Sequence, residues 1–405
     1  MADRDDGIKA RLARKSVYAC AATTSSVKRA LSLWTLLWAL SLISAGSPTT
    51  TFASGPMDEF MDPTDGQLDV SHWLLEKRGF LLNPFVITEP AIGYGGGATL
   101  LFFHEGAKDK EKRQEGEVLG LPPSISFLVG GGTETDSWLA GGGHFGSYLG
   151  DRIRYLGGVG YGEFNIDFYI GDHDIDYTIK GVLLSQQLLA RIVDSDFFLG
   201  GRYVYTHLDS EVDFGIQLPS FIPDSFTFDS SGVGPVVRFD SRDNIFTANN
   251  GIEIELAPIF YTEALGSDAN YQILETTSRG YAQVHEKVVL ALRVDTEWSF
   301  GDTPFFALPA ISARGVPATR YQNEYAVSSE IQGRWNVWKR WSLIGFVGLG
   351  WSGGEIDALD DSEFVPSGGG GFRYLIARLL SLQMGMDFAG SEGEFAFYFQ
   401  IGTGW

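Results

Sequence analysis

Apolar and polar residues alternate with a period of two along most of the chain after about residue 91, and the C-terminal residues 394–405 show this most clearly. One side of an extended strand there carries Phe395, Phe397, Phe399, Ile401, Thr403 and Trp405, and the other carries Glu394, Ala396, Tyr398, Gln400, Gly402 and Gly404. This period with an aromatic face predicts a β-strand with one apolar surface. Such a strand would be a poor edge in water, but the lipid-facing wall of a closed membrane barrel requires it.

The alternation recurs upstream, in 233–240, 252–260 and 288–298. In the last of these segments Arg293, Asp295 and Glu297 share one face, while the other face is apolar. A soluble β-sandwich would show the same pattern strand by strand. The N-terminal export signal and the terminal aromatic residue favour the barrel, with lipid outside and a polar lumen inside.

The lengths of the connections predict the topology. Short connections lie at 193–196, 285–286, 338–340 and 379–380, and long ones at 105–121, 212–226, 301–321 and 352–368. Bacterial barrels have short periplasmic turns, long outer loops and an even number of strands. About fifteen strands can be counted, so we expect an all-β, antiparallel transmembrane barrel of sixteen strands. We expect the missing strand between 121 and 193, where Gly blurs the alternation. A strand at Phe85–Ile87 is the other possibility, and it would move 105–121 to the periplasmic side.

The N-terminus has the pattern of an export signal. Lys9, Arg11, Arg14, Lys15, Lys28 and Arg29 precede the uncharged apolar run 30–45. Such a run is short for a membrane span and suits a signal core, although an anchor helix is the alternative. We expect a signal peptide over 1–53, cleaved near Ala53 or earlier, after Gly46. A periplasmic N-terminal segment over 54–82, with a short helix within 69–77, and the barrel over 83–405 would follow.

Composition excludes several function classes. The 405 residues include 51 Gly and carry a formal net charge of −21, so a nucleic-acid partner is not expected. The single Cys, Cys20, lies in the expected signal peptide, which leaves no thiolate site in the mature chain. The six His show no metal spacing, so we expect no cofactor. His144 near Ser147 and the acidic run Asp172, Asp174 and Asp176 are weak candidates for a hydrolase pair and a calcium site, and we expect no enzyme.

Three segments in the C-terminal half resemble a known family. They are Phe239–Asp243 followed by Asn249–Gly251, the loop Ala313–Tyr321, and Gly369–Tyr374 with the aromatic terminus. Together they resemble the bacterial surface antigen superfamily of BamA- and TamA-like outer-membrane barrels, here without periplasmic repeat domains. The resemblance implies a periplasmic turn motif at Asp240, Arg242 and Gly251, and a C-terminal assembly strand with Phe399, Ile401 and Trp405.

The resemblance also implies that the loop with Arg314, Gly315 and Pro317 folds into the lumen. A buried guanidinium needs a carboxylate partner, and Glu330 has the parity of the polar side of its strand. Asp387 and Glu297 are the alternatives. Two departures from the family pattern are Val316, where an aromatic residue is usual, and the segment 346–350, which has no acid.

By the same resemblance we expect assembly or translocation of protein or lipid in the bacterial outer membrane. A passive channel or structural barrel is the alternative. The expected partners are outer-membrane lipid, the barrel assembly machinery for insertion of the chain itself, and a possible periplasmic partner.

Overall fold

The computed structural model describes residues 60–76, 80–89, 92–104, 122–170, 173–212, 225–318, 320–354 and 362–402. The expected signal peptide and Trp405 lie outside these residues. No helix among the described residues is long and apolar enough to cross a membrane.

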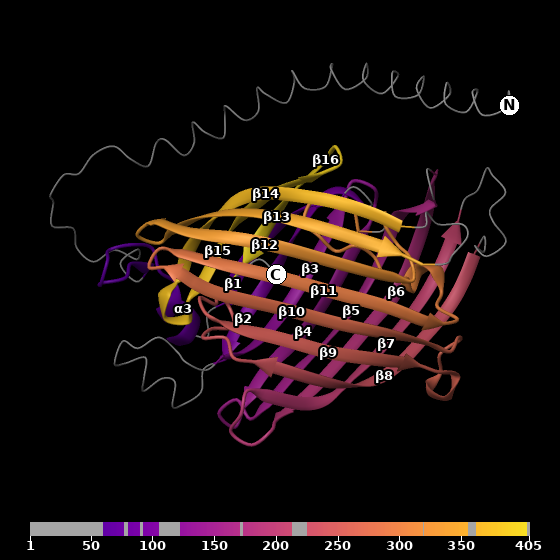
Figure 1. Ribbon diagram of the computed structural model, residues 1–405, viewed down its shortest axis with the longest axis horizontal. Coiled ribbons are helices and arrows are strands. Elements are labelled where there is room, and N and C mark those ends of the chain that lie inside the picture. The colour runs from indigo at the N-terminus through magenta and orange to yellow at the C-terminus, as the bar shows by residue number, and fades with distance from the viewer. Residues whose placement is uncertain are drawn as a thin grey trace, which may run out of the picture. The chain divides into compact units, whose positions relative to one another are not determined.

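Within the described residues, sixteen strands form one antiparallel sheet in which each strand pairs with its neighbours along the chain (Figure 1). The strands are β1 (Phe80–Glu89), β2 (Gly93–His104), β3 (Ser124–Thr133), β4 (Trp138–Tyr148), β5 (Ile153–Ile170), β6 (His173–Arg191), β7 (Phe197–Val212), β8 (Ser225–Asp240), β9 (Gly251–Tyr261), β10 (Tyr271–His285), β11 (Val288–Gly301), β12 (Tyr325–Trp338), β13 (Trp341–Gly353), β14 (Ser362–Ala377), β15 (Leu382–Ser391) and β16 (Glu394–Ile401). The expected all-β fold with sixteen strands is therefore confirmed.

The position of the first strands corrects the sequence-based topology. β1 begins at Phe80, before the expected boundary at residue 83, and contains Phe85–Ile87. β1 pairs with β2, so His104 lies at the same barrel end as Phe80 and as the short turns. The connection 105–121, which lies outside the described residues, therefore runs from β2 to β3 at the barrel end of the short turns, and its prediction as an outer loop was wrong. Its length misled the prediction, because length alone does not fix the side.

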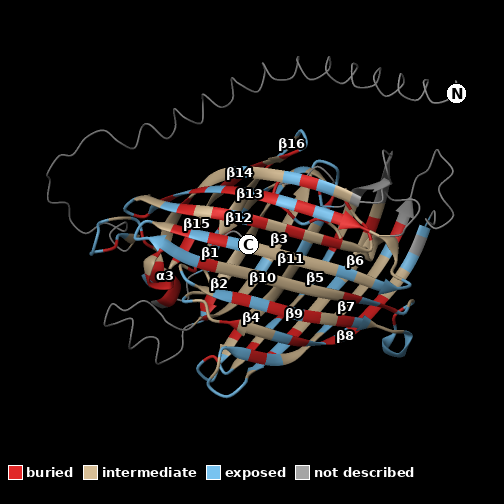
Figure 2. Ribbon diagram, viewed as in Figure 1, coloured by how far each residue is buried: buried red, intermediate tan, exposed pale blue. Residues whose placement is uncertain are grey.

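Burial alternates along the strands as the barrel geometry requires. Along β13, exposed and buried residues alternate from Trp341 to Ser352 (Figure 2). In β16, Phe395 faces outward and is exposed, while Ala396 is buried. Water would penalise these exposed aromatic and aliphatic side chains, whereas a lipid bilayer favours them.

The seam between the first and last strands differs from every other strand junction. β1 and β16 lie next to each other. Among the described residues, however, no ladder joins them, and the hydrogen-bonded order runs only from β1 to β16. Both edges therefore leave backbone N–H and C=O groups without ladder partners, which makes the seam the weakest line along the barrel wall.

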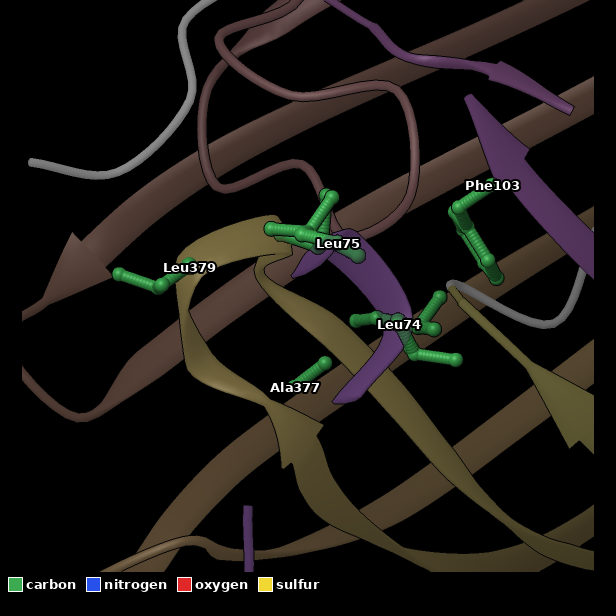
Figure 3. Close-up of a cluster of buried hydrophobic side chains, with 7 residues drawn as sticks. Leu74, Leu75, Phe103, Ala377 and Leu379 are labelled. Atoms are coloured by element: carbon green, nitrogen blue, oxygen red, sulfur yellow. The ribbon is translucent and has the colours of Figure 1, made fainter. Parts of the chain in front are cut away.

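A short helix, α3 (Ser71–Glu76), packs at the barrel end that carries the short turns (Figure 1). Leu74 and Leu75 are buried against Phe103 of β2 and against Ala377 and Leu379 at the β14–β15 turn (Figure 3). Ile401 of β16 packs on the same cluster. The helix thus joins strands on both sides of the seam through apolar contacts.

Candidate functional site

The long connection between β11 and β12, residues 302–324, is here called the latch loop. Its two arms meet in a bridge between Ala310 and Gln322. The backbone N–H of Ser312 donates to the Ser328 hydroxyl on the lumen side of β12, at 2.8 Å. Its apolar tip residues pack together with Val365 of β14; they are Ile311, Ala313, Val316 and Tyr321. The loop is therefore packed against the inner wall and does not extend into the external solvent.

Arg314, at the tip of the latch loop, is 6% exposed and surrounded by acceptors. Its Nε and Nη2 atoms donate to Oε1 of Glu330 on β12, at 2.8 and 2.6 Å. Its Nη1 donates to Oδ2 of Asp387 on β15, at 2.6 Å. The contact predicted with Glu330 is present, and the alternative partner Asp387 takes part as well. Such charge-assisted, multidentate contacts fix an Arg far better than a single hydrogen bond would.

The pocket around Arg314 is filled by further polar and aromatic groups. Nη2 also donates to Oε1 of Gln332, at 3.0 Å, and the guanidinium carbon lies 3.6 Å from the centre of the Phe346 ring. Asp387 is also paired with Arg373 of β14, at 2.7 Å. Arg314 and Arg373 thus form short ion pairs with two carboxylates in the barrel interior, and Arg293 lies 3.9 Å from Glu330. Removal of one member would leave an uncompensated buried charge.

The latch loop also contacts the last strand. The backbone N–H of Gly315 donates to the Tyr398 hydroxyl on β16, at 2.9 Å. Tyr321 donates to Glu392 in the β15–β16 turn, at 2.7 Å, and Arg320 lies 3.4 Å from Glu394. The positive φ of Gly315 (+89°) and its close approach to the Gly390 backbone both require a residue without Cβ. The loop therefore ties β12 to the strands that form one edge of the seam.

The two departures from the family pattern have structural counterparts. Val316 is buried in the apolar tip of the loop, and the adjacent Pro317 is buried as well. β13 supplies Phe346 to the guanidinium face in place of an acid, and the second carboxylate comes from Asp387 of β15. Glu297, the other alternative partner for Arg314, lies on β11 opposite Glu275 of β10.

The predicted turn motif forms a second ion-pair group at the barrel end that carries the short turns. Arg242 donates to Asp240 at 2.8 Å and pairs with Glu253 at 3.0 Å. Gly251 begins β9 with a φ of +110°. A Cβ placed on Gly251 would lie 2.4 Å from the carbonyl oxygen of Ser241, so a side chain would clash there. The sequence did not indicate that Arg154 of β5 also binds Asp240, at 2.6 Å.

A third group was missed entirely. Residues 60–76 are here called the N-terminal strap. Asp62, Asp65 and Asp69 of the strap all accept from Arg340, in the β12–β13 turn, at 2.6–2.7 Å. The acidic residues were visible in the sequence, but nothing local pairs them with an Arg more than 270 positions away.

The side chains considered for catalysis do not form a triad. His144 bonds Ser126 at 2.9 Å, while Ser147 donates to Asp151. Among the described residues no group of His, Cys, Asp and Glu could hold a metal ion. The side chains of Asp172, Asp174 and Asp176 lie outside the description. On the assembly strand, Phe399 pairs with Met386 of β15.

No protein-family model and no curated protein matches the chain. Solved structures do. The barrel superposes on BamA from Haemophilus ducreyi lacking POTRA domains 1–3 with a TM-score of 0.50 and 13% identity, covering 80% of this chain and 70% of that one. CdiB from Escherichia coli superposes with a TM-score of 0.53 and 11% identity, covering 79% of this chain and 62% of that one. CdiB from Acinetobacter baumannii superposes with a TM-score of 0.51 and 9% identity, covering 80% of this chain and 59% of that one.

The chain thus spans less than two thirds of either CdiB protein. At these identities the likeness establishes the fold. Within the described residues, this protein is a sixteen-stranded antiparallel β-barrel with the fold shared by BamA and CdiB.

Proposed function

We propose that this barrel inserts or translocates polypeptide or lipid at the bacterial outer membrane by opening the seam between β1 and β16. The observation that carries the proposal is the seam itself, two adjacent strands without a ladder between them. Opening a paired junction would break a ladder of backbone hydrogen bonds, whereas opening this one breaks few.

Two devices control the edges of the seam. The latch loop binds β15 and β16 through Arg314, Gly315 and Tyr321. The N-terminal strap packs against β2 on one side of the seam and against the β14–β15 turn on the other. Movement of either element would change how readily β16 separates from β1. A structural barrel has no need for such contacts at an unpaired junction.

Depletion of the protein in its native host tests the proposal. We expect a change in the outer-membrane inventory of proteins, lipids or both, restored by the wild-type gene. An unchanged inventory together with high conductance of the purified protein in planar bilayers would contradict it and indicate a passive channel. The latch loop packed inside the lumen predicts low basal conductance.

A further inference from the structure

The inner wall of the barrel has two halves of different chemistry. Arg202 of β7 fixes which side faces the lumen, because its Nη1 reaches Glu275 of β10, beyond β8 and β9, at 2.5 Å. Gln187 of β6 is the ladder partner of Arg202 and bonds it at 2.7 Å. Because directly opposed residues in an antiparallel ladder share a face, the lumen side of each earlier strand can be followed from Gln187.

On β1–β6 this side is largely apolar. Leu156 opposes Gln187, Phe145 opposes Leu156, and Ile125 opposes Phe145. The same ladders place further apolar side chains on the lumen side, namely Leu81, Phe85, Leu101, Phe127, Leu139 and Leu183. On β9–β14, by contrast, the lumen side carries the charged residues Glu255, Arg279, Arg293, Glu330, Arg334 and Arg373. A water-filled pore does not require an apolar wall.

The apolar half contains a groove of about 390 Å³ across β3–β7. Phe127, Leu139 and Leu183 line it, and lumen-facing Gly141, Gly158 and Gly160 leave it hollow. A Cβ added to Gly160 would meet no atom closer than 3.9 Å. Leu183 is 52% exposed in the groove and Leu156 is 46% exposed nearby. This volume falls in the range of ligand sites, about 300–1,000 Å³, and uncovered apolar surface is a favourable place for an apolar ligand.

We propose that this groove binds the acyl chain of a lipid from the surrounding bilayer. This inference rests on the proposed function and names lipid as its substrate class. The lining supplies few groups able to hydrogen-bond, chiefly Ser185 and Thr206, because the glycine backbone is already paired in its ladders. A polypeptide would bring N–H and C=O groups that this surface leaves unsatisfied. An acyl chain requires no such partners.

The seam provides the route from the bilayer. The apolar lumen side continues through β2 to Leu81 and Phe85 of β1, the strand that borders the seam. Between these two, Asn83 is 7% exposed, and its Oδ1 has no hydrogen-bond partner among the described residues. A lipid headgroup that carries a donor would satisfy this acceptor as the chain passes.

Photocrosslinking of the purified full chain tests the proposal. The protein is reconstituted in phosphatidylethanolamine vesicles that contain a phosphatidylethanolamine with a diazirine in one acyl chain. We expect crosslinks on the peptides with Phe127 and Leu183, in addition to those on the outward-facing Leu188 and Leu199. Labelling of the outer wall alone would overturn the proposal.

A filled groove supplies the matched comparison. Gly160→Leu places a side chain in the groove and displaces on the order of two methylene groups, so we expect about tenfold less crosslinking there. Gly280→Leu is the control, because Gly280 faces outward on β10 and a Cβ meets nothing within 4 Å. Heat-modifiable gel migration shows that each variant folds. Undiminished groove labelling in Gly160→Leu would contradict the assignment.

Two further outcomes of the experiment would identify other occupants of the groove. Labelling of the groove by a photoreactive hydrophobic peptide but not by the lipid would overturn the proposal in favour of polypeptide. Crosslinking of residues 213–224 to the groove, in place of lipid, would show that a segment of the same chain occupies the groove. The assay uses no translocation step. Absent groove labelling with normal rescue of a depleted host therefore contradicts only the lipid assignment, and labelling without rescue contradicts only the proposed function.

Discussion

Arg314 and Asp387 lie 2.6 Å apart, from Nη1 to Oδ2, although 73 positions separate them in the chain. This pair connects the latch loop to β15, the strand next to β16, and it is one of several contacts between the loop and this edge of the seam. Because Asp387 also binds Arg373, the link extends into the wall at β14. If the seam opens as proposed, the energetics of this carboxylate bear on how readily it opens.

Arg314→Ala should release the latch loop while the barrel stays folded. Truncation removes the nearest guanidinium partner of the buried Glu330, a loss on the order of 3–5 kcal/mol for a buried pair. We expect higher single-channel conductance and faster proteolysis within the latch loop. Arg320→Ala is the control, since its pair with Glu394 is partly exposed and longer, at 3.4 Å. Equal effects of the two substitutions would contradict a specific role for Arg314.

Asp387→Asn should destabilise the barrel more than Glu330→Gln. The amide at 387 would leave two guanidinium groups, those of Arg314 and Arg373, with weakened partners, whereas Glu330 serves mainly one. The temperature of the heat-induced gel shift measures the difference. A larger loss in Glu330→Gln would show that the wall contact with Arg373 carries little of the stability.

The N-terminal strap should detach in acid. Hydrogen bonds from Arg340 lower the pKa of Asp65. Burial opposes ionisation of Asp62, but hydrogen bonds from Arg378 and from the Thr64 backbone outweigh it and hold the pKa of Asp62 well below its usual range. Because the folded-state pKa values are lowered, the contribution is complete above the ordinary Asp value of about 3.9 and is lost as the pH falls below it.

A fluorophore on His72→Cys, an exposed position of α3, reports this transition. We expect no change between about pH 5 and pH 8 and detachment only below the ordinary carboxyl range. Arg340→Gln should detach the strap already at neutral pH, because the three carboxylates lose their shared partner. A strap that stays bound in this variant would show that the apolar cluster around Leu74 and the contacts with Arg378 hold it without Arg340.

Deletion of the last three residues, or Trp405→Ala, should impair assembly. The C-terminal strand presents outward-facing aromatic residues and completes the wall, with Phe399 opposite Met386 and Ile401 opposite Met384. We expect reduced heat-modifiable protein in the outer membrane. Normal accumulation would show that the terminal aromatic residue is dispensable.

The strand pattern could be predicted from local parity. The Arg314–Glu330 contact could be predicted because the family resemblance implied a loop inside the lumen and parity placed Glu330 on the lumen side of its strand. Alternation assigns each side chain to lipid or lumen, and a buried Arg needs a lumen-facing acid. The position of β1 and the barrel end at which 105–121 lies could not be predicted, because the length of a loop does not fix the end of the barrel on which it lies.

Long-range pairing explains the remaining omissions. Arg340 occupies a short turn without any local sign that three Asp of the strap will meet there. The apolar lumen of β1–β6 was hidden because Gly occupies many of its positions and blurs the alternation. Only the register of the ladders shows which face Phe127 and Leu183 occupy.

Locking the seam with a disulfide tests the central claim most directly. Cys20, in the expected signal peptide, is the only Cys of the chain, so pairs of cysteines along β1 and β16 can be screened without interference. Leu199→Cys with Val237→Cys is the control, since these outward residues oppose each other in the β7–β8 ladder. The oxidised seam pair should fail to rescue a depleted host and regain function on reduction, while the control pair rescues in both states. Full rescue by the oxidised seam pair would contradict seam opening.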